Sequence, residues 1–412
     1  MTGSSTSNTD LGELSLKLQE GRAVVAGALS GTSADGIDVV LFRPRMGSRA
    51  ELQDHGVKDL GWIHFGTTAF EPKLRTELRH VLDGGQLDLG RVACLHRDLG
   101  VAFGMAARDA AKRANVDLDL VGSHGQTVWH HDGNHPAGRA SLQLGDGDFL
   151  AEIAGAPVVS DFRQGDLATG GEGAPIGHVV DPWLYPALFG QGRCGPSHVS
   201  SPPSAGILNL GGFGNLTLGG ERGQLVSFDT GPAGALLDGL ARQCFGVEMD
   251  LDGERAARGV VRPELFATWM GELESFLQTA PPRSTGRDTF GESWVRGLVA
   301  GSEGACGEDL LATGASVVAA CVARSLEHVP GSTSLDELVL AGGGVQNPVL
   351  VRAIEAATGV PVTSSRQHGV DPDAREALIF GLLGAAHVLG IARPARVLGK
   401  FSPGPARECS DE

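Results

Sequence analysis

Three glycine-rich segments each follow a stretch that the sequence predicts as a β-strand. They are SGTSADGID at 30–38, NLGGFGNLT at 209–217 and AGGGVQNP at 341–348. Glycine lets backbone N–H groups approach an anion because no Cβ stands in the way, and such concave turns form phosphate sites. Each segment alone is more often an ordinary tight turn. None has the GxxxxGK[ST] or GxGxxG spacing, which disfavours a Walker loop and nicotinamide binding.

Carboxylates stand beside two of these turns. Asp35 and Asp38 lie in the first, and Asp229 lies in FDTGP after the second. Mg²⁺ prefers carboxylates and waters together with substrate phosphates, so these three residues are candidate metal ligands. The alternative is an Asx-turn or a helix N-cap. For Asp229, which precedes a predicted helix, helix capping and metal binding have equal weight.

Two polar segments are candidates for the chemistry itself. Asp166 lies in the glycine-rich run 161–175, which we expect to be irregular, and a carboxylate there could act as general base, although a solvated turn residue is the commoner case. The run SHGQT, 123–127, ends a predicted strand, where open α/β sheets place ligand contacts. Its hydroxyls, imidazole and amide suit a polyhydroxylated substrate. Zinc at His124, His130 and His131 is disfavoured, because adjacent histidines point apart and no carboxylate partner is suitably spaced.

The elements that position these residues repeat along the chain. Strand, glycine turn and strand open the first half at 24–42 and the second half at 206–218. Helical periodicity marks the segments 72–82, 89–114, 232–244, 263–277, 309–328 and 374–390. We expect a loop over 125–139, fraying after Lys400, and burial of the last helix against the sheet of the first half.

Length and composition bound the class of protein. A chain of 412 residues exceeds one usual core, so two domains are expected, with a cleft between them as the default ligand site. The formal charge of −16 opposes adhesion to nucleic acid or an anionic membrane. The start lacks a signal-peptide pattern, no stretch reaches about 18 apolar residues, and the six scattered cysteines are expected to be reduced thiols. We therefore expect a cytoplasmic protein.

Taken in order, the motifs resemble those of the anhydro-N-acetylmuramic acid kinases. The similar runs are SGTSADGID, GSHGQTVWH, LQLGDGDFLAEIAGAPVVSDFRQGD, GGEGAPI, NLGGFGNLT, FDTGPAG, LAGGGVQNP and DPDAREALIFGLLGA, within about 24–390. The chain departs from the family pattern at Ala34, where Met is common, at QLGDGD, where QIGDP is usual, and at FDTGPAG, which lacks an Asn.

The resemblance implies an α/β fold of two actin-like (ribonuclease H-like) domains, each a mixed five-stranded sheet flanked by helices, with an interdomain cleft. The expected ranges are a disordered segment 1–20, a first domain 21–190 completed by 385–402, an insertion or linker 191–204 and a second domain 205–384. The implied cofactors are ATP and Mg²⁺. The implied reaction converts 1,6-anhydro-N-acetylmuramic acid to N-acetylmuramic acid 6-phosphate in peptidoglycan recycling, and a homodimer is typical.

The resemblance also assigns roles to individual residues. Asp166 would be the catalytic base that activates water, and Asp35, Asp38 and Asp229 would bind the metal. ATP would contact Gly31, Thr32, Ser33, Asp35, Gly36, Asp38, Asn209, Gly211, Gly212, Asn215, Asp229, Thr230, Gly231, Gly342, Gly343, Gly344 and Asn347. The sugar would contact Ser123, His124, Gln126, Thr127 and Glu376.

Two other functions remain open from the sequence. A levoglucosan-type kinase would use the same ring-opening chemistry on a sugar without lactyl and acetamido groups. A non-catalytic ATP-binding module of the same fold would use nucleotide to regulate a protein partner, although the pair DFRQGD and SHGQT has no evident purpose there.

Overall fold

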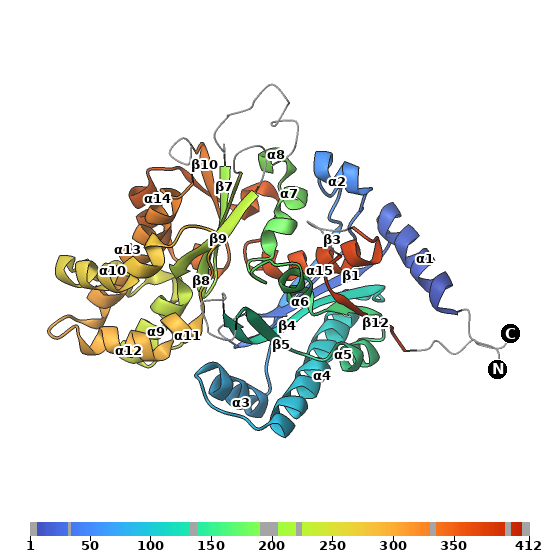
Figure 1. Ribbon diagram of the computed structural model, residues 1–412, viewed down its shortest axis with the longest axis horizontal. Coiled ribbons are helices and arrows are strands. Elements are labelled where there is room, and N and C mark those ends of the chain that lie inside the picture. The colour runs from blue at the N-terminus through green and yellow to red at the C-terminus, as the bar shows by residue number, and fades with distance from the viewer. Residues whose placement is uncertain are drawn as a thin grey trace. The chain divides into compact units, whose positions relative to one another are not determined.

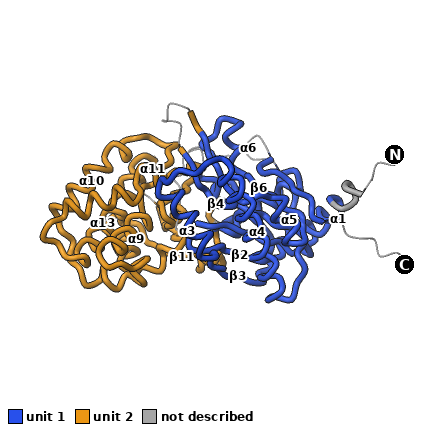
Figure 2. Tube along the Cα trace, turned by 90° about the horizontal axis from the view of Figure 1, so that it is seen from below, with its two compact units in different colours: residues 1–130, 140–186, 376–412 blue, residues 131–139, 187–375 orange. Residues whose placement is uncertain are grey.

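A computed structural model describes residues 6–31, 34–131, 138–189, 205–219, 225–329, 335–391 and 397–405 of the chain. It contains two compact units (Figure 2). Unit 1 comprises residues 1–130, 140–186 and 376–412, and unit 2 comprises residues 131–139 and 187–375. The expected insertion at 191–204 lies outside the described residues.

The described part of unit 1 forms a seven-stranded sheet in the order β12-β6-β4-β1-β2-β3, with β5 paired to β4. Its strands are β1 (Val25–Ser30), β2 (Gly36–Phe42), β3 (Trp62–Ala69), β4 (Leu120–His131), β5 (Ala140–Leu144), β6 (Val158–Ser160) and β12 (Lys400–Ser402). Strands β1, β2 and β3 pair antiparallel, whereas β4 runs parallel to both β1 and β6.

Unit 2 repeats this pattern in a five-stranded sheet of order β11-β10-β7-β8-β9, of which Figure 1 labels β7, β8, β9 and β10. Its strands are β7 (Ala205–Leu210), β8 (Phe213–Gly219), β9 (Leu225–Pro232), β10 (Glu337–Ala341) and β11 (Val362–Ser364). Again the first three strands pair antiparallel and the last two run parallel to the first. This order and these directions, present twice, are those of the ribonuclease H-like, actin-like fold, so the predicted fold class is confirmed.

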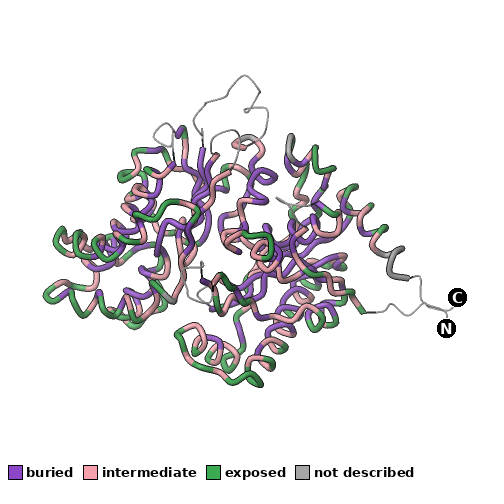
Figure 3. Tube along the Cα trace, viewed as in Figure 1, coloured by how far each residue is buried: buried purple, intermediate pink, exposed green. Residues whose placement is uncertain are grey.

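Helices cover both sheets. Unit 1 contains α1 (Thr6–Glu20), α2 (Arg49–His55), α3 (Pro72–Leu82), α4 (Leu89–Ala114), α5 (Gly147–Ala154), α6 (Phe162–Ala168), α7 (Asp181–Leu184) and most of α15 (Arg375–Val388), while α8 (Pro186–Phe189) spans the boundary. Unit 2 contains α9 (Gly234–Phe245), α10 (Pro263–Gln278), α11 (Arg287–Phe290), α12 (Glu292–Ala300), α13 (Gly307–Leu326) and α14 (Pro348–Thr358). Each unit has its own apolar core, seen as the buried segments in Figure 3.

The helix α15 lies directly on the central strands of unit 1. A Cβ built on Gly27 of β1 would overlap the carbonyl oxygen of Ala377, and one on Gly122 of β4 would overlap that of Phe380. The neighbouring residues Ala26 and Ala28 belong to the core that α4 covers, and side chains alternate between the faces of a strand. Thus α4 and α15 pack on opposite faces of the same strands, and the predicted burial of the last helix is confirmed.

Several expectations from the sequence are wrong. Residues 6–20 form α1 and bury Leu14 and Leu18, where disorder was expected over 1–20. The expected loop 125–139 begins as a continuation of β4 to His131, and the irregular run 161–175 contains α6. The sheet of unit 1 has seven strands rather than five, partly because the expected frayed end contributes β12, which pairs with β6.

The helix α13 is long and apolar. By length and composition alone it could cross a membrane, although no such segment is expected from the sequence, but 72% of its apolar window is buried inside the protein. The core helix of a soluble protein passes the same test, so this single described helix is weak support for a membrane span. Among the described cysteines, Cys94, Cys244, Cys306 and Cys321 are free thiols, as expected.

The glycine contacts beneath α15 predict a large cost for added volume. Replacing Gly27 with Ala should lower the free energy of unfolding by about 2–3 kcal/mol, because backbone on both sides cannot move aside easily. Urea unfolding measures this cost. The matched control is Gly12→Ala in α1, where a Cβ would meet no atom within 4 Å; it should be neutral or stabilise by up to about 1 kcal/mol. Equal stabilities of the two variants would contradict the packing argument.

Candidate active site

The first glycine turn joins β1 to β2 in unit 1. Gly31 follows β1, Asp35 is exposed in the turn, and Thr32 and Ser33 lie outside the described residues. Gly36 begins β2. Asp38 lies within β2, where its Oδ1 accepts a hydrogen bond of 2.6 Å from Thr67 Oγ1 on β3. Asp35 therefore lies in the turn, directly before β2, and Asp38 lies within β2 itself.

The strand β4 bulges where the SHGQT run begins. Ala28 pairs with Ser123, whereas Ser30 pairs with Gln126, so β4 has one extra residue between these two pairs. Gly125 supplies the required backbone conformation with φ +70°, and its N–H donates to Ser123 Oγ at 3.3 Å. Because of the extra residue, His124 and Gln126 point to opposite faces of β4.

Gln126 connects β4 to the first glycine turn. Its Nε2 donates to Gly31 O at 3.3 Å and to Thr127 O at 3.1 Å. Gln126 Oε1 and Ser30 Oγ, on paired residues, are buried without a hydrogen-bond partner among the described residues. Buried polar atoms are normally satisfied, so these two fit contact with a polar ligand or water. Sequence reasoning missed Ser30, although its place at the end of a strand was a usable signal.

His124 is buried and both of its ring nitrogens contact the protein. Its Nδ1 lies 3.2 Å from Gly125 O, and its Nε2 accepts a hydrogen bond of 3.0 Å from Arg163 Nε. Nδ1 is therefore the protonated nitrogen and donates to Gly125 O. Burial, and secondly the Arg163 guanidinium, lower the pKa of His124 to about 3, so the ring is neutral. It also packs on Phe380 of α15 with ring centroids 4.4 Å apart.

This geometry favours an indirect role for His124. Both ring nitrogens already have protein partners, so the ring positions Arg163 rather than offering a free nitrogen to the sugar. Sequence reasoning missed Arg163, although it stands three residues before Asp166 in DFRQGD. The pairing of His124 with Arg163 is a tertiary contact across 39 residues, which no local pattern displays.

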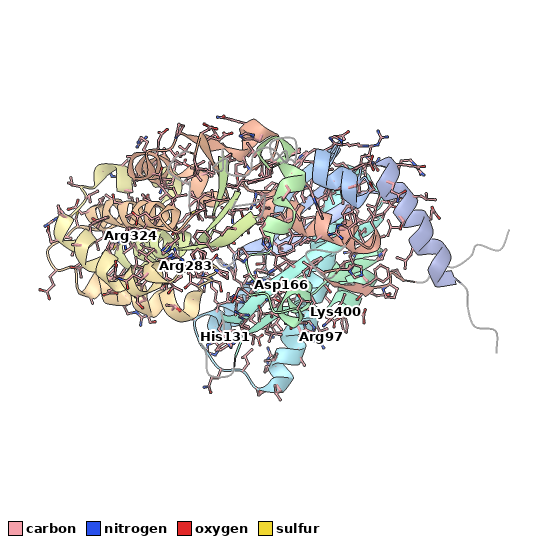
Figure 4. The ribbon with its side chains drawn as sticks, turned by 45° about the horizontal axis from the view of Figure 1, so that its top comes forward. Arg97, His131, Asp166, Arg283, Arg324 and Lys400 are labelled. Carbon is pink, nitrogen blue, oxygen red and sulfur yellow. The ribbon has the colours of Figure 1, made fainter. Side chains whose placement is uncertain are left out.

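Asp166 lies near the end of α6 (Figure 4). Its Oδ2 accepts a hydrogen bond of 2.8 Å from the backbone N–H of Gly173. A Cβ on Gly171 would overlap the carboxylate, so the glycine segment closes directly over Asp166. At the start of the same helix, Lys400 forms an ion pair with Asp161, which links α6 to β12.

The remaining expected sugar contacts also lie in unit 1. Gln143 Nε2 donates to Thr127 Oγ1 at 3.3 Å, and Gln164 of α6 donates to Ser141 O at 2.6 Å, which ties α6 to β5. Glu376 is half-buried in the first turn of α15. Unit 1 therefore contains the candidate base, the SHGQT residues and the first glycine turn.

Asp229 of unit 2 does not cap a helix, since it lies within β9 and the helix α9 has Ala233 at its N-cap. Asn215 Nδ2 donates to its Oδ1 at 3.0 Å, and the Thr285 N–H donates to its Oδ2 at 2.8 Å. The capping alternative is therefore wrong. The buried Arg283, labelled in Figure 4, donates from Nε to the Asp229 carbonyl at 3.0 Å and fixes this part of the strand.

The other glycine turns of unit 2 are attached to helix starts. Gly211 O accepts from Gly234 N at 3.0 Å and Gly212 O from Ala235 N at 2.8 Å, which fixes the second turn against α9. Asn347 Oδ1 accepts from Val349 N and Leu350 N and so caps α14. The other expected nucleotide residues of unit 2 lie on strands or in the third turn: Asn209 on β7, Thr230 and Gly231 on β9, and Gly342, Gly343 and Gly344 after β10.

The described residues contain no group of three or more His, Cys, Asp or Glu side chains that could hold a metal by themselves. Mg²⁺ commonly uses one or two carboxylates and completes its shell with waters and substrate phosphates. Asp35 and Asp38, as hard oxygen donors beside a glycine turn, fit such a shared site. Both oxygens of Asp229 already accept protein hydrogen bonds, so it fits a contact through water better than direct ligation.

The doubled fold, with glycine turns beside carboxylates, defines an actin-like α/β protein suited to binding phosphate groups. A family model for anhydro-N-acetylmuramic acid kinase matches residues 23–398, and the chain belongs to this family. It is therefore a kinase with a small sugar as substrate and ATP as phosphoryl donor.

Curated relatives named anhydro-N-acetylmuramic acid kinase align with this chain over most of their own length. The relative from Xanthomonas campestris pv. campestris is 37% identical, and the alignment covers 90% of this chain and 92% of the relative. The relative from Salinibacter ruber is 36% identical, with 90% of this chain and 91% of the relative covered. The relative from Bacillus cereus is 32% identical, with 87% of this chain and 91% of the relative covered. Among solved structures, the Acidaminococcus fermentans (R)-2-hydroxyglutaryl-CoA dehydratase component A matches with a TM-score of 0.44 at 15% identity, over 89% of this chain and 99% of that one.

The contact between Gly171 and Asp166 predicts a selective loss of activity. Replacing Gly171 with Ala should displace the carboxylate from the Gly173 N–H and lower kcat by at least about tenfold, on the scale of general-base catalysis. The melting temperature should change little, because the atoms that the new Cβ would meet belong to the Asp166 side chain and not to the backbone. The control Ala168→Ser, exposed on the same helix, should keep full activity. If Gly171→Ala is as active as the control, the carboxylate does not need this position.

The neutral state of His124 predicts a pH-dependent stability. The unfolded chain binds a proton below about pH 6.5, but the folded chain does so only near pH 3, so stability falls as the pH decreases through this range. This residue should contribute a slope of up to about 1.4 kcal/mol per pH unit. Urea unfolding at about pH 4.5 and pH 7 should show a smaller difference in His124→Gln than in the wild type. Equal differences would mean that His124 is not held neutral.

Proposed function

We propose that this kinase converts 1,6-anhydro-N-acetylmuramic acid to N-acetylmuramic acid 6-phosphate and opens the anhydro ring with water in the same reaction. The observation that carries the proposal is the fixed carboxylate of Asp166. It lies in the unit that also holds His124, Gln126 and the first glycine turn, with one oxygen bound to Gly173 N–H at 2.8 Å. The names of the relatives in the family support the choice of sugar.

The proposed reaction begins at water. Asp166 accepts a proton from a water molecule whose oxygen attacks the anomeric carbon C1. The C1–O6 bond breaks, its electron pair stays on O6, and O6 takes the γ-phosphoryl group from ATP. ADP leaves, and the proton is later released from Asp166 to solvent. This sequence makes Asp166 the single acid–base group of the reaction.

The remaining residues of the site would hold ATP. Phosphoryl transfer demands positioning and charge neutralisation more than covalent chemistry, and turns rich in backbone N–H groups supply both. The turn at Gly31 would contact the phosphates from unit 1, and Asn209, Gly211 and Gly212 would do so from unit 2. Gly342, Gly344 and Asn347 would contact the nucleoside. Mg²⁺, held by Asp35 and Asp38, would neutralise charge on the β- and γ-phosphates.

The cellular setting of the reaction belongs to the same proposal. A sugar with a 1,6-anhydro ring and a lactyl group comes from peptidoglycan, so the enzyme would act in recycling this polymer inside the cytoplasm. The charge of −16 favours a protein that binds neither nucleic acid nor an anionic membrane surface. A homodimer is expected from the family resemblance, and sedimentation of the purified protein tests it.

Removing the carboxylate should abolish most turnover. Asp166→Asn should lower kcat on ATP, Mg²⁺ and the anhydro-sugar by at least about 100-fold, because both the base and the positioning of water are lost. The measurement is formation of the 6-phosphate product. Unchanged turnover in this variant would overturn the assignment of the base.

Isotope labelling tests ring opening separately. In water enriched with ¹⁸O, the product should gain one labelled oxygen at C1 and none in the phosphate, because water attacks carbon and O6 comes from the sugar. Unlabelled product placed in the same water corrects for exchange at the anomeric centre. Label at C6 or in the phosphate would contradict the proposed bond cleavage.

A further inference from the structure

Arg283 is a buried arginine that joins three elements of unit 2. Its Nη1 donates to the carbonyl oxygens of Leu277 and Thr279, at the end of α10, with distances of 2.9 and 2.7 Å. Its Nη2 donates to Ser325 Oγ, near the end of α13, at 2.7 Å. Its Nε donates to the carbonyl oxygen of Asp229 on β9 at 3.0 Å. One side chain therefore connects two helix ends to a strand.

The surroundings of Arg283 keep a charge inside the protein. Burial lowers the pKa of Arg283 to about 10, so the guanidinium is still charged at neutral pH. The carbonyl oxygens at the end of α10 carry partial negative charge, and the rings of Phe228 and Phe276 face the guanidinium at 5.4 and 4.7 Å. A buried charge is often no more stabilising than an apolar side chain of similar volume. Packing alone therefore does not account for an arginine at this position.

The segment 283–285 fixes Asp229 through both its backbone and its side chain. The Asp229 N–H donates to the carbonyl oxygen of Arg283 at 3.0 Å, so Arg283 binds both backbone groups of this residue. The N–H of Thr285 donates to Asp229 Oδ2 at 2.8 Å. The strand β9 is the last in the order of its sheet, and the outer side of such an edge strand has no neighbouring strand to pair with. The segment 283–285 takes the place of that neighbour at Asp229.

The same network lies beneath the residues that follow Asp229. Gly231 has φ +129°, and a Cβ built on it would lie 3.6 Å from the ring of Phe276 and 3.7 Å from Cys321. Phe276 is also a ring on which the Arg283 guanidinium packs. The strand end 229–231 is thus held by Arg283 directly at its first residue and through Phe276 at its last. All three residues of this strand end are expected nucleotide contacts.

We propose that Arg283 is a positioning residue for the nucleotide and acts by holding the strand end 229–231 where it contacts the phosphates of ATP. Phosphoryl transfer depends on positioning, and a displacement of about 1 Å can cost roughly 100-fold in rate. A guanidinium has five N–H donors in one rigid plane, so it can bind the carbonyl of β9 and two helix ends at the same time. The inference rests on the proposed nucleotide contacts of unit 2 and deepens them.

The test measures the affinity for Mg·ADP, a nucleotide that binds without reacting, by titration calorimetry. In Arg283→Met the dissociation constant should rise about tenfold, the scale expected for the loss of a charged hydrogen bond. KM for the anhydro-sugar should stay within about threefold of the wild type, because the expected sugar contacts lie in unit 1. A similar rise in both quantities would indicate a general distortion of the protein and would overturn the inference.

Arg324 supplies the matched control, because it also joins α10 to α13; both arginines are labelled in Figure 4. Arg324 of α13 pairs with Glu274 of α10 at 3.2 Å and with Glu327 at 3.5 Å, and neither partner belongs to β9. Arg324→Met should therefore leave the dissociation constant for Mg·ADP within about twofold of the wild type. Equal increases in Arg283→Met and Arg324→Met would mean that the link between the helices matters and the contact with β9 does not.

The variant Arg283→Lys separates positioning from stability. Lysine keeps a cation for the carbonyl oxygens at the end of α10, so the free energy of unfolding should recover relative to Arg283→Met. It lacks the second donor group that reaches β9, so the dissociation constant for Mg·ADP should stay at least about threefold above that of the wild type. If affinity recovers together with stability, or if folded Arg283→Met binds Mg·ADP as tightly as the wild type, Arg283 has a structural role alone and the inference is overturned.

Hydrogen exchange of the wild type decides the inference even if Arg283→Met does not fold. Because coupling between two sites is reciprocal, Mg·ADP should slow amide exchange in the peptide that contains residues 283–285, whereas the anhydro-sugar alone should not. Unchanged exchange in this peptide with Mg·ADP would contradict the inference. The proposed function fails separately: a wild type that binds Mg·ADP but does not phosphorylate the anhydro-sugar would refute the proposed reaction, and the affinities would still decide the role of Arg283.

Discussion

The single extra residue at Gly125 determines how unit 1 arranges its candidate site. In a regular strand His124 and Gln126 would share a face, since side chains alternate with a period of two. The bulge places them on opposite faces, so that Gln126 holds Gly31 while His124 holds Arg163. Neighbouring residues of β4 thereby contact two different parts of unit 1, the first glycine turn and α6. A residue with a side chain at position 125 would be strained at φ +70° and would also overlap the carbonyl of Leu144.

The position of α15 follows from a second local constraint. Gly27 and Gly122 let the helix backbone touch β1 and β4, which brings Phe380 close enough to contact both His124 and Phe162. Phe380 is thus the common support of β4 and α6. The helix that completes unit 1 comes from the end of the chain, whereas the strands come from its beginning. The site therefore depends on packing between residues that are 350 apart in the sequence for Gly27 and Ala377 and 258 apart for Gly122 and Phe380.

How far the sequence predicts this structure depends on whether the signal is local. The bounds of α3 and α4 are predicted to the residue, because periodic apolar side chains and the residues at the helix ends are local features. The extension of β4 is missed because its buried residues Ser123, His124 and Gln126 are polar, and polarity favours a loop prediction. The helix α6 is missed for a related reason, since glycines surround it and its support comes from Ser141, Phe380 and Lys400.

The family motifs identify the candidate residues but not their partners. Both DFRQGD and SHGQT are recognisable in the sequence. The hydrogen bond between Arg163 and His124 is not, because it joins α6 to β4 and forms only when the two elements pack together. The same limit applies to Asp229, whose partners Asn215 and Thr285 come from a neighbouring strand and a distant loop. Its sequence position left helix capping as an equal alternative to metal binding, whereas strand pairing makes Asp229 the centre of a polar cluster.

The two units place a cross-strand polar pair at equivalent positions. In unit 1 Asp38 of β2 pairs with Thr67 of β3, and in unit 2 Asn215 of β8 pairs with Asp229 of β9. Both pairs join the second and third strands beside a glycine turn, but the carboxylate stands on the second strand in one unit and on the third in the other. Each oxygen of the Asp229 carboxylate accepts a hydrogen bond, one from Asn215 and one from Thr285. The doubled fold therefore supplies two equivalent places for a carboxylate, and the partners differ: a threonine hydroxyl at Asp38, and a side-chain amide and a backbone N–H at Asp229.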